Sequence, residues 1–125
     1  MDTVSRYAKA LAAADRDGLL ATLADDVQLH PPTSEKVFQG REVVSTVLCA
    51  VTDVLRAFTV TETVGSADGR RHGVVFDALV DEMPLQGWDL LELDADGRVA
   101  VITVMMRPLP ALATFAELMG RRLAR

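Results

Sequence analysis

The feature that most constrains the fold is a run of strand-like segments in the second half of the chain. Four segments are rich in β-branched and other apolar side chains, namely residues 58–64, 74–81, 85–93 and 99–106. In several of these segments, apolar and polar side chains alternate. Only short stretches of Gly, Asp, Ser or Pro residues separate the segments. Strands joined by such short turns pair antiparallel, so this half predicts an antiparallel meander.

Helical patterns account for most of the remaining sequence. Apolar residues recur every three or four positions over residues 4–11, 19–23, 44–55 and 112–123. Asp15 is a typical N-cap for the second of these predicted helices. Three predicted helices therefore precede the meander, and one follows it.

A short strand and a loop lie between the second and third predicted helices. Residues 27–30 alternate in polarity, Pro31 and Pro32 end that strand, and residues 31–40 predict a loop. The expected order is therefore α-α-β-α-β-β-β-β-α. Helices gathered mostly before the sheet must cover one of its faces, so we expect an α+β fold in a single domain over residues 1–125.

Composition and charge limit the expected partners. Thirteen Lys and Arg residues are scattered among 18 Asp and Glu residues, giving a net charge of −5. This argues against nucleic acid or an anionic membrane as a partner. No apolar stretch reaches the ~20 residues of a membrane span, and no signal-peptide pattern opens the chain, so we expect a cytoplasmic location. The two histidines are far apart and lack metal-ligand spacing, so neither a metal nor a cofactor is expected.

One carboxyl group stands out from its surroundings. Because side chains alternate along the strand 85–93, Asp89 shares a face with Leu85, Leu91 and Leu93. Burying a charged carboxyl among apolar side chains is costly, so Asp89 must be paired, protonated or lining a cavity. The pattern leaves these three alternatives open, and each bears on function.

Several short motifs are spread along the chain. They are Arg6-Tyr7, residues 14–20 and 23–27, residues 38–42 and residues 87–99. With these motifs the chain resembles the nuclear transport factor 2-like superfamily, and most closely its SnoaL-like and ketosteroid-isomerase-like branches. The resemblance implies a cone-shaped, curved antiparallel sheet wrapped around the N-terminal helices. It implies no single function, because this fold hosts isomerases, cyclases, dehydratases, transport factors and plain binding proteins.

The resemblance also suggests a catalytic set. A ketosteroid isomerase holds an enolate oxygen with a tyrosine and a protonated aspartic acid, and Tyr7 and Asp89 match these two residues. The position of the family's aspartate base holds Pro31, which cannot accept a proton. His30 is a candidate replacement base near neutral pH, although neighbouring strand residues face opposite sides. The alternative is a strand-end histidine that is bonded locally.

The sheet face that would look into the cone supplies candidate ligand-binding residues. By resemblance these are Phe76, Ala78, Leu91, Ile102, Val104 and Met106. The expected ligand is a small apolar oxygenated molecule, polyketide-like or steroid-like. Proton transfer, isomerisation, cyclisation and dehydration are the reactions that the resemblance implies, and non-catalytic ligand binding is the alternative.

The opposite sheet face suggests a different role. Trp88 and Leu90 alternate with Asp89 and therefore lie on the outer face. An exposed tryptophan is often an interface anchor, and the resemblance implies dimerisation through this face. We therefore expect a homodimer; the alternative is a tryptophan that the chain's own loops cover.

Overall fold

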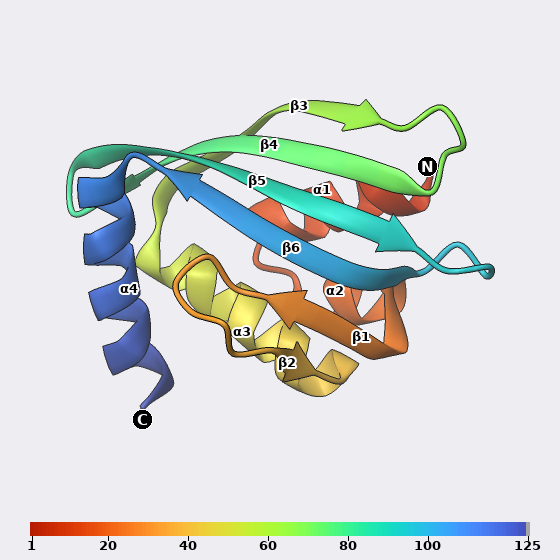
Figure 1. Ribbon diagram of the computed structural model, residues 1–125, viewed down its shortest axis with the longest axis horizontal. Helices are drawn as coiled ribbons and strands as arrows, with labels where there is room; N and C mark the ends of the chain where they lie inside the picture. Colours follow the sequence, from red (N-terminus) through yellow and green to blue (C-terminus); the bar gives the residue numbers. More distant parts are fainter. Residues whose placement is uncertain (125) are drawn as a thin grey trace.

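The computed structural model describes residues 1–124, and over these residues the chain forms one six-stranded sheet and four helices (Figure 1). The helices are α1 (Thr3–Ala12), α2 (Arg16–Thr22), α3 (Arg41–Val54) and α4 (Leu109–Leu123). The strands are β1 (Leu23–His30), β2 (Phe38–Gln39), β3 (Arg56–Gly65), β4 (Arg71–Val80), β5 (Met83–Leu93) and β6 (Val99–Arg107). Their order across the sheet is β2-β1-β6-β5-β4-β3.

The α+β fold class predicted from the sequence is confirmed. Strands β3 to β6 form the expected antiparallel meander, and Figure 1 shows α1, α2 and α3 gathered behind the sheet. One pairing differs from the expected antiparallel sheet, since β1 runs parallel to β6 and the sheet is therefore mixed. A parallel neighbour requires a long connection, and here α3 and the meander provide it.

Two local predictions are corrected at the edges of β1. The loop predicted over 31–40 contains β2, which pairs antiparallel with β1 at the edge of the sheet. Leu23 was predicted in the second helix but is the first residue of β1, with an extended backbone at φ −91° and ψ 141°. Leu23 is buried, and a buried apolar residue at a helix–strand junction fits both the helical and the strand periodicity. The sequence pattern alone therefore could not decide between the two elements.

Helix α1 is fixed at its start and along one side. The carboxylate of Asp2 accepts a hydrogen bond from the Ser5 backbone N–H at 2.8 Å, which caps the helix. One face buries Val4, Tyr7 and Leu11 against the core. Because α1 packs against β3 and β4, this face delivers the Tyr7 side chain to the inner surface of the sheet.

Strand β5 alternates as its sequence predicts. Leu85, Gly87, Asp89 and Leu91 are buried on the inner face, whereas Trp88 is exposed on the outer face. This alternation places the carboxyl of β5 on the side of the sheet that the helices cover.

Helix α4 closes one end of the molecule. It follows β6 and stands across the end of the sheet (Figure 1), where it packs against α3 and strands β4 to β6. Its buried residues are Ala111, Phe115 and Met119. No helix within residues 1–124 is long and apolar enough to cross a membrane.

A glycine in β5 makes room for an aromatic ring on the inner face. Gly87 lies directly opposite Phe76 of β4, and the Phe76 ring stacks on Phe58 with centroids 4.6 Å apart. A Cβ atom at position 87 would lie 2.0 Å from Cζ of Phe76. The ring therefore occupies the space that any other residue at position 87 would need.

We expect Gly87→Ala to lower the free energy of unfolding by about 1–3 kcal/mol, as overpacking in a core usually does. Urea denaturation measures this change. In a double-mutant cycle, Phe76→Leu should relieve part of the clash, so that the two effects are not additive. Additive effects would contradict the proposed collision.

Candidate functional site

A buried pair joins α1 to β5. The Tyr7 hydroxyl donates a hydrogen bond to Oδ2 of Asp89 at 2.8 Å. Tyr7 is fully buried and Asp89 is 3% exposed. The apolar stripe of α1 and the alternation of β5 bring the two groups together. The hydrogen-bond partner of Asp89 is therefore the tyrosine that the resemblance indicated.

Burial sets the protonation of both groups. It raises the pKa of Asp89 from 3.8 to about 6, against the smaller opposing effect of the Tyr7 hydrogen bond. It also raises the pKa of Tyr7 well above its ordinary value, with the Asp89 charge adding to the effect. Tyr7 therefore stays a neutral hydrogen-bond donor near neutral pH, whereas Asp89 changes charge near pH 6.

One oxygen of the Asp89 carboxyl is left for another partner. Within residues 1–124, every fully buried side-chain oxygen or nitrogen has a hydrogen-bond partner. The Tyr7 bond to Oδ2 is the hydrogen bond that the structure gives this carboxyl, so Oδ1 is the oxygen that a ligand or water could still contact. In the protonated acid, Oδ2 accepts from Tyr7 and the proton lies on Oδ1, the oxygen that is free.

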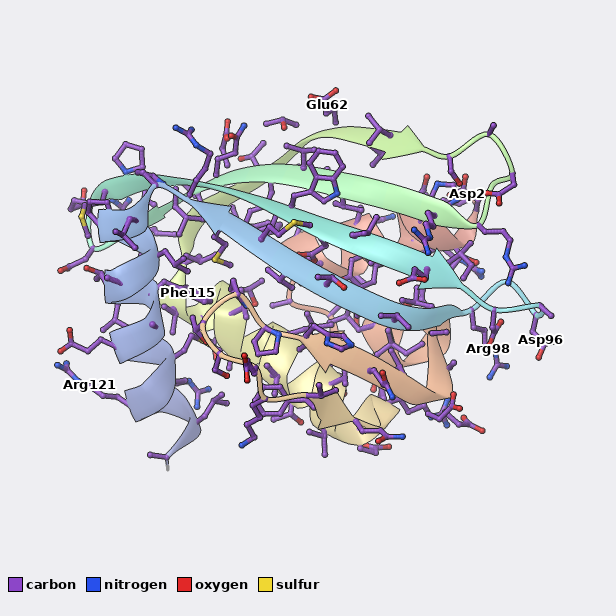
Figure 2. All side chains as sticks on the ribbon, in the orientation of Figure 1. Asp2, Glu62, Asp96, Arg98, Phe115 and Arg121 are labelled. Atoms are coloured by element: carbon purple, nitrogen blue, oxygen red, sulfur yellow. The ribbon has the colours of Figure 1, made fainter. Side chains whose placement is uncertain are left out.

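An apolar cavity of about 160 Å³ lies between the sheet and helices α3 and α4. It is bordered by β1, β2, β6, α3, α4 and the segment 31–34, and its walls include Leu29, Val47, Val104, Met106, Phe115 and Met119. Figure 2 shows Phe115 on the side of α4 that faces the rest of the molecule, whereas Arg121 of the same helix points away.

Val104 is the residue that links the pair to the cavity wall. This residue lies directly opposite Asp89 in the pairing of β5 with β6, and side chains at such positions are neighbours on one face, with Cβ atoms about 4.5–5.5 Å apart. Val104 lines the cavity, whereas Asp89 and Tyr7 do not.

The structure separates the predicted ligand-binding residues into two groups. Val104 and Met106 line the cavity. The other residues of that prediction pack in the hydrophobic core instead; they are Phe76, Ala78, Leu91 and Ile102. The helices fill the inner surface of the sheet near these four residues, so the cavity occupies only the end of the cone that α4 covers.

His30 lies apart from the pair. It is opposite Thr103 of β6 and alternates with Leu29, whose side chain is buried and lines the cavity. His30 therefore lies on the other face of β1, and the structure does not bring it together with Tyr7 and Asp89. Pro31, which stands at the family's base position, does line the cavity.

The walls supplied by α3 and α4 could not be identified from the sequence. Val47, Phe115 and Met119 follow ordinary helical periodicity, which indicates burial but not which end of the sheet a helix covers. Over residues 1–124, no cluster of three His, Cys, Asp or Glu side chains is placed to hold a metal ion.

The raised pKa of Asp89 predicts a specific pH dependence of stability. Between pH 3.8 and about 6 the folded carboxyl binds its proton while the unfolded one has lost it, so stability falls as the pH rises through this window. Relative to Asp89→Asn, the wild type should lose about 2 kcal/mol between pH 4 and pH 7. Urea unfolding of both proteins measures the difference, and a difference that does not vary with pH would contradict the shifted pKa.

Comparisons with known proteins agree with this architecture. Residues 4–107 match the SnoaL-like domain family. A crystal structure of a steroid delta-isomerase from Pseudomonas aeruginosa is similar at 37% sequence identity and a TM-score of 0.91, with 98% of this chain and 89% of that chain covered. A protein with a cystatin-like fold from Silicibacter pomeroyi is similar at 30% identity and a TM-score of 0.93, covering 98% and 85% of the two chains.

A more distant structure shares the fold alone. It is an NTF-2 like protein from Burkholderia xenovorans, at 19% identity and a TM-score of 0.71, with 83% of this chain and 79% of that chain covered. No curated protein matches the chain. The family match spans most of the chain, and the chain belongs to the SnoaL-like domain family, within the nuclear transport factor 2-like fold.

Proposed function

We propose that this protein binds a small apolar molecule that carries a carbonyl or phenolic oxygen. The apolar body of the ligand would occupy the cavity beside Val104, and its oxygen would accept a hydrogen bond from Oδ1 of Asp89. The observation that carries the proposal is the Tyr7–Asp89 hydrogen bond, which leaves one carboxyl oxygen without a protein partner and lies across the strand pair from Val104, a residue that lines the cavity.

The chemistry of the pair suits oxygen recognition. Tyr7 orients the carboxyl so that its acid proton points away from Oδ2. A hydrogen-bond donor in a dry apolar environment stabilises developing negative charge on a ligand oxygen far better than the same donor in water. Polarisation of a ligand oxygen is shared by isomerisation, cyclisation and dehydration, which are the reactions that the family resemblance implies.

Catalysis is the second candidate, and the 37% identity to a steroid delta-isomerase favours it. Enolisation of a ketone also needs a base, and the family's base position holds Pro31, which lines the cavity but cannot accept a proton. In this candidate His30 would act as the base after turning around the end of β1. The geometry supports oxygen binding more directly than proton abstraction.

Cyclohexanone is a direct probe of the proposed binding, because its carbonyl oxygen can only accept a hydrogen bond. We expect its affinity, measured by NMR titration, to fall about tenfold per pH unit above pH 6, as Asp89 loses its proton. Asp89→Asn keeps a donor that does not titrate, so its affinity should not vary with pH. Wild-type affinity that is constant from pH 5 to pH 8 would contradict the proposal.

Proton exchange separates the two candidates. If the protein is catalytic, it should speed the exchange of cyclohexanone α-protons in D₂O above the buffer rate, and His30→Ala should remove the increase. Binding without faster exchange would support ligand binding and contradict catalysis of proton transfer. The same NMR sample gives both measurements.

We also propose that the outer face of the sheet forms a homodimer. Trp88 is 39% exposed and lies directly opposite Met105, which is 48% exposed. Beside them, Asp77, Gln86 and Arg107 form a cross-strand row. A twofold axis parallel to β5 would place Asp77 of one protomer opposite Arg107 of its partner, so this row is self-complementary in charge.

We expect Trp88→Ala to shift sedimentation from dimer toward monomer, because truncating a central aromatic anchor usually costs more than 1 kcal/mol of binding. Arg107→Glu should have the same effect, and Asp77→Arg combined with it should restore part of the dimer. A wild-type protein that sediments as a monomer at high concentration would refute the interface.

A further inference from the structure

The size of the cavity limits the ligand that it can enclose. Its volume is about 160 Å³. A dry apolar cavity of ~150 Å³ in another protein accommodates one benzene molecule, whereas pockets for drug-sized ligands measure roughly 300–1,000 Å³. The cavity therefore fits one ring, and the four fused rings of a steroid exceed it.

The mouth of the cavity lies between the segment 31–34 and helix α4. The exposed lining residues identify this mouth: Thr33 and Ser34 lie on one side, and Gly120 and Leu123 lie on the other. Gly120 is exposed to solvent as well as lining the cavity, which places it at the rim. Helix α4 itself lies beyond residues 4–107, the part of the chain that matches the SnoaL-like family.

Neither of the usual structural reasons for a glycine applies to Gly120. The residue lies inside α4, and its φ is not positive, unlike that of Gly97. A Cβ atom at position 120 would meet no neighbouring atom within 4 Å, whereas one at Gly18 would lie 2.6 Å from Oδ2 of Asp15. Glycine weakens a helix interior relative to alanine, so position 120 retains a destabilising residue that neither backbone nor packing requires.

We propose that the cavity accepts a single-ring oxygenated ligand and that Gly120 keeps its mouth open. The inference rests on the proposed function, because it assigns the size class of the ligand that the Tyr7–Asp89 pair would hold. A larger side chain at position 120 would extend from α4 into open space at the rim and would cross the path between solvent and the cavity.

Two leucine substitutions in the same helix test the role of the mouth. Gly120→Leu should weaken cyclohexanone binding at pH 5 at least tenfold in NMR titrations. Ala113→Leu, at an exposed α4 position outside the cavity lining, should leave it within twofold of wild type. Gly120→Leu should melt at or above the wild-type temperature, because leucine is the better helix former, so lost binding would not reflect lost folding.

A steroid ketone tests the size limit. Wild type should bind cyclohexanone, and dihydrotestosterone should cause no NMR shift changes up to its solubility limit. Steroid affinity equal to or above that of cyclohexanone would overturn the inference, as would a Gly120→Leu variant that binds cyclohexanone like wild type. Either result would leave the proposed function standing. A wild type that does not bind cyclohexanone at pH 5 would overturn both.

Discussion

The hydrogen bond from Tyr7 to Asp89 is the interaction on which the rest of the site depends. It joins the first helix to the centre of the sheet, between two side chains that are almost fully buried. Burial alone would make a charged carboxyl costly at this position, and the raised pKa lets the group become neutral instead. The same bond determines which oxygen of Asp89 remains available, and the apolar cavity begins at its neighbour Val104.

The proposed site contains a hydrogen-bond donor pair, but among the residues that the structure describes no proton acceptor is placed beside it. Pro31 occupies the wall where the family's base would stand, and His30 lies on the other face of β1. The donor pair and the cavity are therefore retained without an evident base. This combination is the reason that we propose ligand binding first and catalysis second.

Much of the fold follows from local sequence patterns. Period-two alternation predicted the meander and placed Asp89 on the inner face, and helical periodicity placed Tyr7 on a buried stripe. The partnership of the two residues came from family resemblance, because nothing local links positions so far apart in the chain. The parallel pairing of β1 with β6 and the covering of the cavity by α4 depend on tertiary packing. Because local patterns do not reveal this packing, Phe76 and Leu91 were expected to line the cavity, but they lie in the hydrophobic core.

The most direct test is a carbon-13 NMR titration of the Asp89 carboxyl, with and without cyclohexanone. We expect a midpoint near pH 6 in the free protein. The ligand should move this midpoint upward, because a carbonyl that accepts the Asp89 proton favours the protonated acid. A midpoint near the ordinary value of 3.8 that cyclohexanone does not change would contradict the account.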